Sequence, residues 1–60
     1  MDISKVIGTN LTAWMADSAD LNTIEKVEAR SGVGFGTVRR TKRGGGNITV
    51  EKLTAIAGAF

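Results

Sequence analysis

Apolar residues in this chain recur at intervals of three and four positions, and no segment alternates convincingly between apolar and polar residues. Intervals of three and four place side chains along one face of a helix, whereas a half-buried strand requires a period of two. The spacing therefore predicts an all-α fold. In the first helix we expect an inward stripe, with Trp14 in the core rather than stacked on a ligand: Ile3, Ile7, Leu11, Trp14 and Met15.

Residues 17–20, "DSAD", interrupt the first stripe, and three further helices are predicted after them. Asn22 and Glu25 have the spacing of a capping box at the start of the second helix. Gly32 follows the last periodic residue of that helix, where a left-handed glycine would end it. We expect Val33 in the turn, facing the core. The inward positions of the second and third helices are Ile24, Val27 and Val38.

The fourth helix follows a loop at residues 44–47, "GGGN", in which glycine is concentrated. Thr49 is its expected N-cap, and Glu51 lies in its first turn, where an acidic residue favours the helix dipole. The residues at helical spacing here are Val50, Leu53, Ile56, Ala57 and Phe60. The sequence thus predicts four helices, two of them joined by a turn of about three or four residues.

Composition excludes most catalytic and metal chemistry. The chain has 60 residues with no cysteine and no histidine. A disulfide framework, a thiolate metal site and a Ser-His-Asp triad are therefore ruled out. We expect one domain, no cofactor and no enzymatic activity. No apolar run approaches the ~20 residues of a membrane span, and the N-terminus lacks signal-peptide features, so a cytosolic location is the default expectation.

Charge is distributed unevenly along the chain. The overall net charge is +2, but residues 1–29 sum to −3 and residues 44–60 balance. Residues 30–43 sum to +5 because they contain no acid and five cations: Arg30, Arg39, Arg40, Lys42 and Arg43. A concentrated basic segment on a nearly neutral chain suggests a docking face for an anion, with an ordinary solvated face as the alternative.

The glycines in the stretch "SGVGFGTVRRTKR", residues 31–43, have two possible interpretations: a nucleotide-binding loop or a helix-turn-helix that binds DNA. A nucleotide cradle would require a preceding strand and a βαβ unit or a kinase domain, which do not fit this chain. In a helix-turn-helix protein, by contrast, the second helix enters the DNA major groove. Gly32 would then turn the chain, while Gly34 and Gly36 would allow close approach of a bulky ligand. The alternative is a plain basic helix.

These residues resemble the Cro and phage-repressor family of helix-turn-helix proteins. "RSGVGFGTVRR" is similar to the family's helix-turn-helix unit, "NITVEKLTAIAGAF" to its closing helix and "NLTAWMADS" to its first helix. The resemblance spans about Ile7 to Phe60. It implies a compact four-helix repressor-like DNA-binding domain over residues 1–60, acting as a phage- or prophage-type transcriptional regulator, most often a repressor. Family members often continue into a further helix or domain, so the chain could be the N-terminal part of a longer repressor.

The resemblance also implies a partner and site residues. The partner is a double-stranded, palindromic DNA operator. Phe60 is either a core residue or the contact of a weak homodimer. The expected base-reading residues are Phe35, Gly36, Arg39 and Arg40. The expected phosphate contacts are Gly34, Thr37, Lys42, Arg43, Gly45 and Asn47.

Three departures from the family pattern bear on these roles. Glu28 replaces a small alanine, so its carboxylate must reach solvent or pair, for example with an arginine of the next helix. Gly34 replaces a capping serine or threonine and would leave backbone N–H groups free for a phosphate. Ile24 replaces a phosphate-contacting glutamine.

Two alternatives remain. The first is a protein-interaction module of the same fold, binding an antirepressor or a partner subunit without specific DNA readout. The second is single-stranded RNA binding, which calls for aromatic stacking platforms, and only Phe35 is available.

Overall fold

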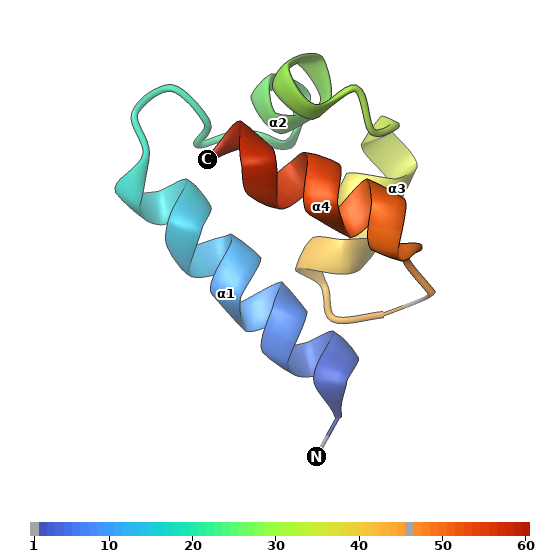
Figure 1. The fold of residues 1–60 in the computed structure, drawn as a ribbon. Coiled ribbons are helices and arrows are strands. Elements are labelled where there is room, and N and C mark those ends of the chain that lie inside the picture. The colour runs from blue at the N-terminus through green and yellow to red at the C-terminus, as the bar shows by residue number, and fades with distance from the viewer. Residues whose placement is uncertain (1, 46) are drawn as a thin grey trace.

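The chain forms four helices (Figure 1). The computed structural model describes residues 2–45 and 47–60. The helices are α1 (Ile3–Asp17), α2 (Ile24–Ser31), α3 (Phe35–Lys42) and α4 (Val50–Ala59), and the described residues contain no strand. The predicted all-α fold is confirmed. In the same residues, no helix combines the length and the apolarity that a membrane crossing requires.

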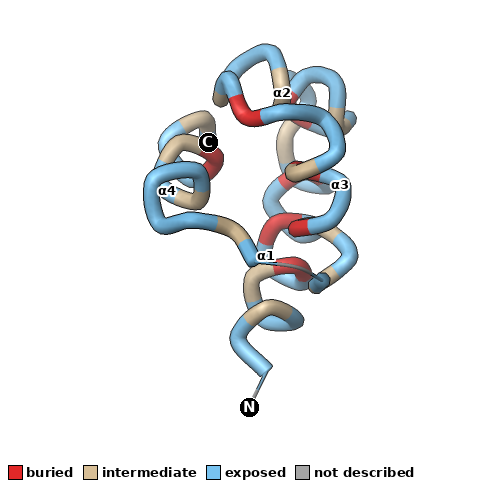
Figure 2. The backbone as a smooth tube through the Cα atoms, turned by 90° about the vertical axis from the view of Figure 1, so that its right-hand side faces the viewer, coloured by how far each residue is buried: buried red, intermediate tan, exposed pale blue. Residues whose placement is uncertain are grey.

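The core draws one or two side chains from each part of the chain. Helix α3 packs against α1 and α2, and α2 also packs against α4. Val27 and Val38 are fully buried, and Val33 faces the core from the turn, as predicted. Figure 2 shows the buried positions on the inner sides of the helices. Fully burying one such side chain contributes ~1.5–3 kcal/mol. The core residues are Leu11, Met15, Leu21, Val27, Val33, Val38 and Ile56.

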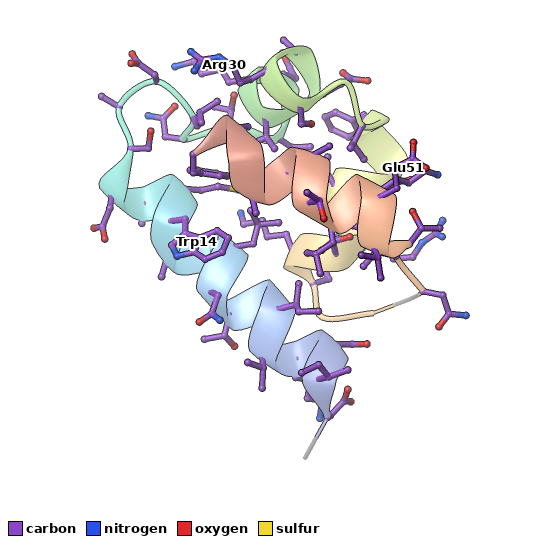
Figure 3. The ribbon with its side chains drawn as sticks, viewed as in Figure 1. Trp14, Arg30 and Glu51 are labelled. Carbon is purple, nitrogen blue, oxygen red and sulfur yellow. The ribbon has the colours of Figure 1, made fainter. Side chains whose placement is uncertain are left out.

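Several residues of the predicted apolar stripes are instead exposed, among them Ile3, Trp14, Val50 and Ala57. The exposed fractions are 64% for Ile3, 80% for Val50 and 43% for Trp14. Ile3 and Val50 are the first residues of α1 and α4, and the start of α1 extends past the other helices (Figure 1). Trp14 lines an apolar groove of about 220 Å³ between α1 and α4. The backbones of these two helices do not approach each other closely within the described residues. The core prediction for Trp14 was therefore wrong (Figure 3).

The start of α2 also differs from its prediction. Thr23, not Asn22, is the N-cap, and its hydroxyl accepts a hydrogen bond from the Lys26 N–H at 3.2 Å. Asn22 accepts instead from the Lys26 ammonium at 3.0 Å. Because the helix begins one residue later, Glu25 occupies its second position, and the predicted capping box does not form.

Two other predicted helix ends are confirmed, at Gly32 and Thr49, and the structure adds a second left-handed glycine, Gly44, after α3. Gly32 ends α2 in the left-handed conformation, with φ of 75°, and its N–H donates to the Glu28 carbonyl. Thr49 caps α4 as predicted, since its hydroxyl accepts from the Lys52 N–H. Gly44, with φ of 79°, follows α3. Each left-handed position favours glycine because a Cβ atom would be strained there.

Helices α1 and α3 meet through their backbones at Gly8. A Cβ atom at Gly8 would lie 2.7 Å from the Gly44 nitrogen and 2.8 Å from the Lys42 carbonyl oxygen. Backbone atoms cannot rotate away, so this crossing requires glycine at position 8. The sequence indicated only that Gly8 weakens helix propensity; its packing role appears once α1 is placed against α3.

Candidate nucleic-acid interface

Helices α2 and α3 form the predicted helix-turn-helix unit. The residues Gly32, Val33 and Gly34 separate the two helices, in agreement with the predicted turn length. Val27 of α2, Val33 of the turn and Val38 of α3 belong to one buried cluster, which fixes the two helices against each other. The opposite side of α3 is left free to face solvent.

The exposed side of α3 carries three arginines around a shallow groove of about 240 Å³. We name this the arginine groove; its lining is Gly36, Arg39, Arg40 and Arg43. These positions follow the spacing i, i+3, i+4 and i+7, which is one face of a helix. All four are exposed, and Phe35, at the start of the same helix, is 40% exposed. The structure thus brings together the predicted base-reading residues.

The N-terminal end of α3 is capped from α2. Gly34 has no side chain to cap the helix, and the Glu28 carboxylate accepts a hydrogen bond from the Phe35 N–H at 3.0 Å. Glu28 therefore pairs with backbone rather than with an arginine. The expectation that Gly34 would leave this N–H free for a phosphate is wrong for Phe35, because an anionic group already occupies it. Thr37, in the same first turn, is half-buried.

The C-terminal end of α3 closes in a Schellman motif. The Gly44 N–H donates to the Thr41 carbonyl at 3.0 Å, and the Gly45 N–H donates to the Arg40 carbonyl at 3.1 Å. Because its N–H is engaged, Gly45 does not offer the backbone donor expected of it. Gly46 of the predicted "GGGN" loop lies outside the described residues. Asn47 is exposed, as a phosphate contact requires.

A second basic groove, of about 390 Å³, lies between α1 and the C-terminal end of α3. We name it the lysine groove; its lining is Lys5, Gly8, Thr9, Thr12, Lys42, Arg43 and Gly44. It contains Lys42 and Arg43, two of the predicted phosphate contacts. It also contains Lys5 and Thr9, which the sequence did not indicate, because nothing in the first helix shows that it crosses the end of the third.

Two further residues lie apart from these grooves. Arg30 projects from α2, away from the C-terminal end of α3 (Figure 3). Phe60 contacts Trp14 of the same chain, with ring centroids 5.7 Å apart and an interplanar angle of 51°. Phe60 remains 42% exposed. Its contact within the chain gives it a structural role, and its remaining surface is accessible to a second molecule.

In the described part of the chain, no three carboxylate, histidine or cysteine side chains gather into a group that could hold a metal ion. Comparison with protein-family models gave no match, and neither a curated protein nor a solved structure matches the chain. The resemblance to Cro and phage repressors therefore stays a prediction from the residues quoted above.

Proposed function

We propose that this chain binds double-stranded DNA sequence-specifically through α3 and regulates transcription as a repressor of the Cro type. The observation that carries the proposal is the arginine groove on a helix whose other side is locked into the core. Three guanidinium groups on one exposed helical face provide planar donors for guanine O6 and N7 atoms and for phosphates. Phe35, at the leading end, offers an apolar surface to a thymine methyl group.

Gly36 supports the same proposal. Beyond its own turns of helix, a Cβ atom at Gly36 would meet no atom of the described protein within 4 Å, and the φ of Gly36 lies outside the left-handed region. The fold therefore does not require glycine here, although glycine inside a helix is less favourable than alanine by ~1 kcal/mol. A ligand that approaches the α3 backbone closely would account for the glycine.

Band-shift measurements on duplexes selected from a random pool, and on random-sequence duplex, test the proposal. Arg39→Ala and Arg40→Ala should relax the preference at particular base pairs, by ~1–3 kcal/mol for a bidentate contact. The Arg39 and Arg40 side chains leave the helix in directions ~100° apart about its axis, so we expect one of them to read bases and the other to contact a phosphate. Lys42→Ala should weaken binding to all duplexes alike and reduce the salt slope of log affinity by ~0.9. An affinity that does not change with salt would contradict the proposal.

On this proposal, two copies bind the two half-sites of a palindromic operator, about one helical turn apart. The exposed part of Phe60 is the expected contact between them. Loss of cooperativity in Phe60→Ala on a two-half-site duplex, with little change on one half-site, would support this arrangement. The rival function, a protein-interaction module without DNA readout, predicts no discrimination between selected and random duplexes.

A further inference from the structure

The lysine groove gathers positive charge from two helices. Lys5 comes from α1, while Lys42 and Arg43 come from the end of α3, and no carboxylate lines the groove. Thr9 adds a hydroxyl-bearing side chain to the wall. Three cations around one concave surface repel one another, and an anion in the groove would relieve that repulsion.

The base of this groove is formed by backbone. Gly8 and Gly44 approach so closely that a Cβ atom on Gly8 would fall 2.9 Å from the Gly44 Cα atom. A Cβ atom on Gly44 would fall 3.2 Å from the Lys5 Cα atom. The same close approach that joins α1 to α3 therefore holds Lys5 next to the end of α3. The position of the Lys5 backbone is set by packing rather than by a flexible loop.

Helix polarity would oppose an anion at this place, because the C-terminal end of a helix carries about half a negative charge. The carbonyl groups responsible are largely satisfied here. The Arg39, Arg40 and Thr41 carbonyls accept hydrogen bonds from the Arg43, Gly45 and Gly44 N–H groups, in that order. Three full positive charges exceed the residual dipole, so the local field favours an anion.

Arg43 lines both the lysine groove and the arginine groove. The two grooves are therefore adjacent around the C-terminal end of α3, and the basic surface continues from Gly36 on α3 to Lys5 on α1. A nucleic-acid strand whose bases face the arginine groove would carry its phosphates past Arg43 toward Lys5.

We propose that the lysine groove is a phosphate-binding site in which Lys5, together with Lys42 and Arg43, holds a phosphate of the DNA backbone next to the bases that face α3. This assignment rests on the proposed function for the source of the phosphate, since free phosphate has the same chemistry. It adds α1 to the interface and makes Lys5 a binding residue.

Two probes test the site. The first is random-sequence duplex DNA at several salt concentrations, with wild-type protein, Lys5→Ala, Lys5→Arg and the control Lys52→Ala. Lys52 is an exposed residue of α4 that lines neither groove, so its loss changes the net charge equally. We expect Lys5→Ala to lower the magnitude of the salt slope by ~0.9 and the affinity several-fold at low salt. Lys5→Arg and Lys52→Ala should retain the wild-type slope.

The second probe is inorganic pyrophosphate, followed by the amide NMR shifts of Thr9 and Gly44. We expect saturable shifts that Lys5→Ala abolishes without changing the melting temperature. DNA binding whose salt slope is the same in Lys5→Ala would overturn the site and leave the proposed function intact. Pyrophosphate shifts without any DNA binding would reject the proposed function and retain the groove as a site for free phosphate. Absence of both responses would reject the site as well.

Discussion

Two helical glycines have opposite surroundings: Gly8, at the contact between α1 and α3, and Gly36, on the outward face of α3. Gly8 is buried, and a side chain there would collide with backbone atoms of Gly44 and Lys42. Gly36 is exposed, and a side chain there would meet no atom of the protein. Glycine has a lower helix propensity than alanine, most of all in a helix interior such as position 8. The packing of the fold therefore requires the first glycine, whereas no contact within the fold requires the second.

Replacing Gly8 is the strongest test of this difference. Gly8→Ala should destabilise the fold by about 2 kcal/mol, because overpacking against backbone outweighs the ~1 kcal/mol gain in helix propensity. In a domain of this size, the melting temperature should fall by roughly 10 °C, as measured by circular dichroism. The matched control is Gly58→Ala in α4, where a Cβ atom meets nothing within 4 Å and stability should rise. A neutral Gly8→Ala would show that the two backbones can separate at little cost.

The N-terminal end of α3, at Phe35, is capped by the Glu28 carboxylate of α2. Glu28→Ala should destabilise the protein by about 1 kcal/mol, the typical value of a lost helix cap. Gly34→Ser should recover most of that loss, because φ of −58° and open space at Gly34 accept a serine that can cap α3 locally. Urea unfolding of the two single variants and the double variant gives the coupling energy. Additive effects would mean that Glu28 does not act through the end of α3.

A charge-neutral replacement of Glu28 tests the functional side of the comparison. Glu28 places a negative charge at the start of α3, where a passing phosphate would be repelled. Glu28→Gln keeps a hydrogen-bond acceptor for the Phe35 N–H but removes that charge. On the proposed function, its affinity for duplex DNA at low salt should therefore increase a few-fold, by about 1 kcal/mol at most. An unchanged affinity would place the DNA away from this end of α3.

Replacing Gly36 has the smallest expected effect on stability and the most specific effect on binding. Gly36→Ala should stabilise the fold by about 0.5–1 kcal/mol, because it improves helix propensity without a clash. If DNA approaches the α3 backbone here, the same variant should bind the selected duplex more weakly, and Gly36→Val more weakly still. Thermal unfolding and band shifts on the same samples separate the two effects. If Gly36→Ala bound the selected duplex more strongly in proportion to its higher stability, DNA binding would not explain the glycine at this position.

The sequence alone determined the features that depend on neighbouring residues. The spacing of apolar residues predicted the helices, Gly32 predicted the end of α2, and Val27, Val33 and Val38 were correctly expected in the core. It also predicted Arg39 and Arg40 on the outward side of α3, where both are exposed. These features follow from helical periodicity and from backbone conformation at single positions, both of which operate within a few residues.

Only the tertiary structure decided which faces meet. It left Trp14 half-exposed, because the backbones of α1 and α4 stay apart in the described residues and an apolar groove remains between them. It placed Glu28 on the Phe35 N–H across the turn, and it brought Lys5 to the end of α3 through the contact at Gly8. Helical periodicity specifies the direction of a side chain relative to its own helix axis. The partner it meets depends on where the helices cross, and that is set by the shapes of side chains and backbone far apart in the sequence.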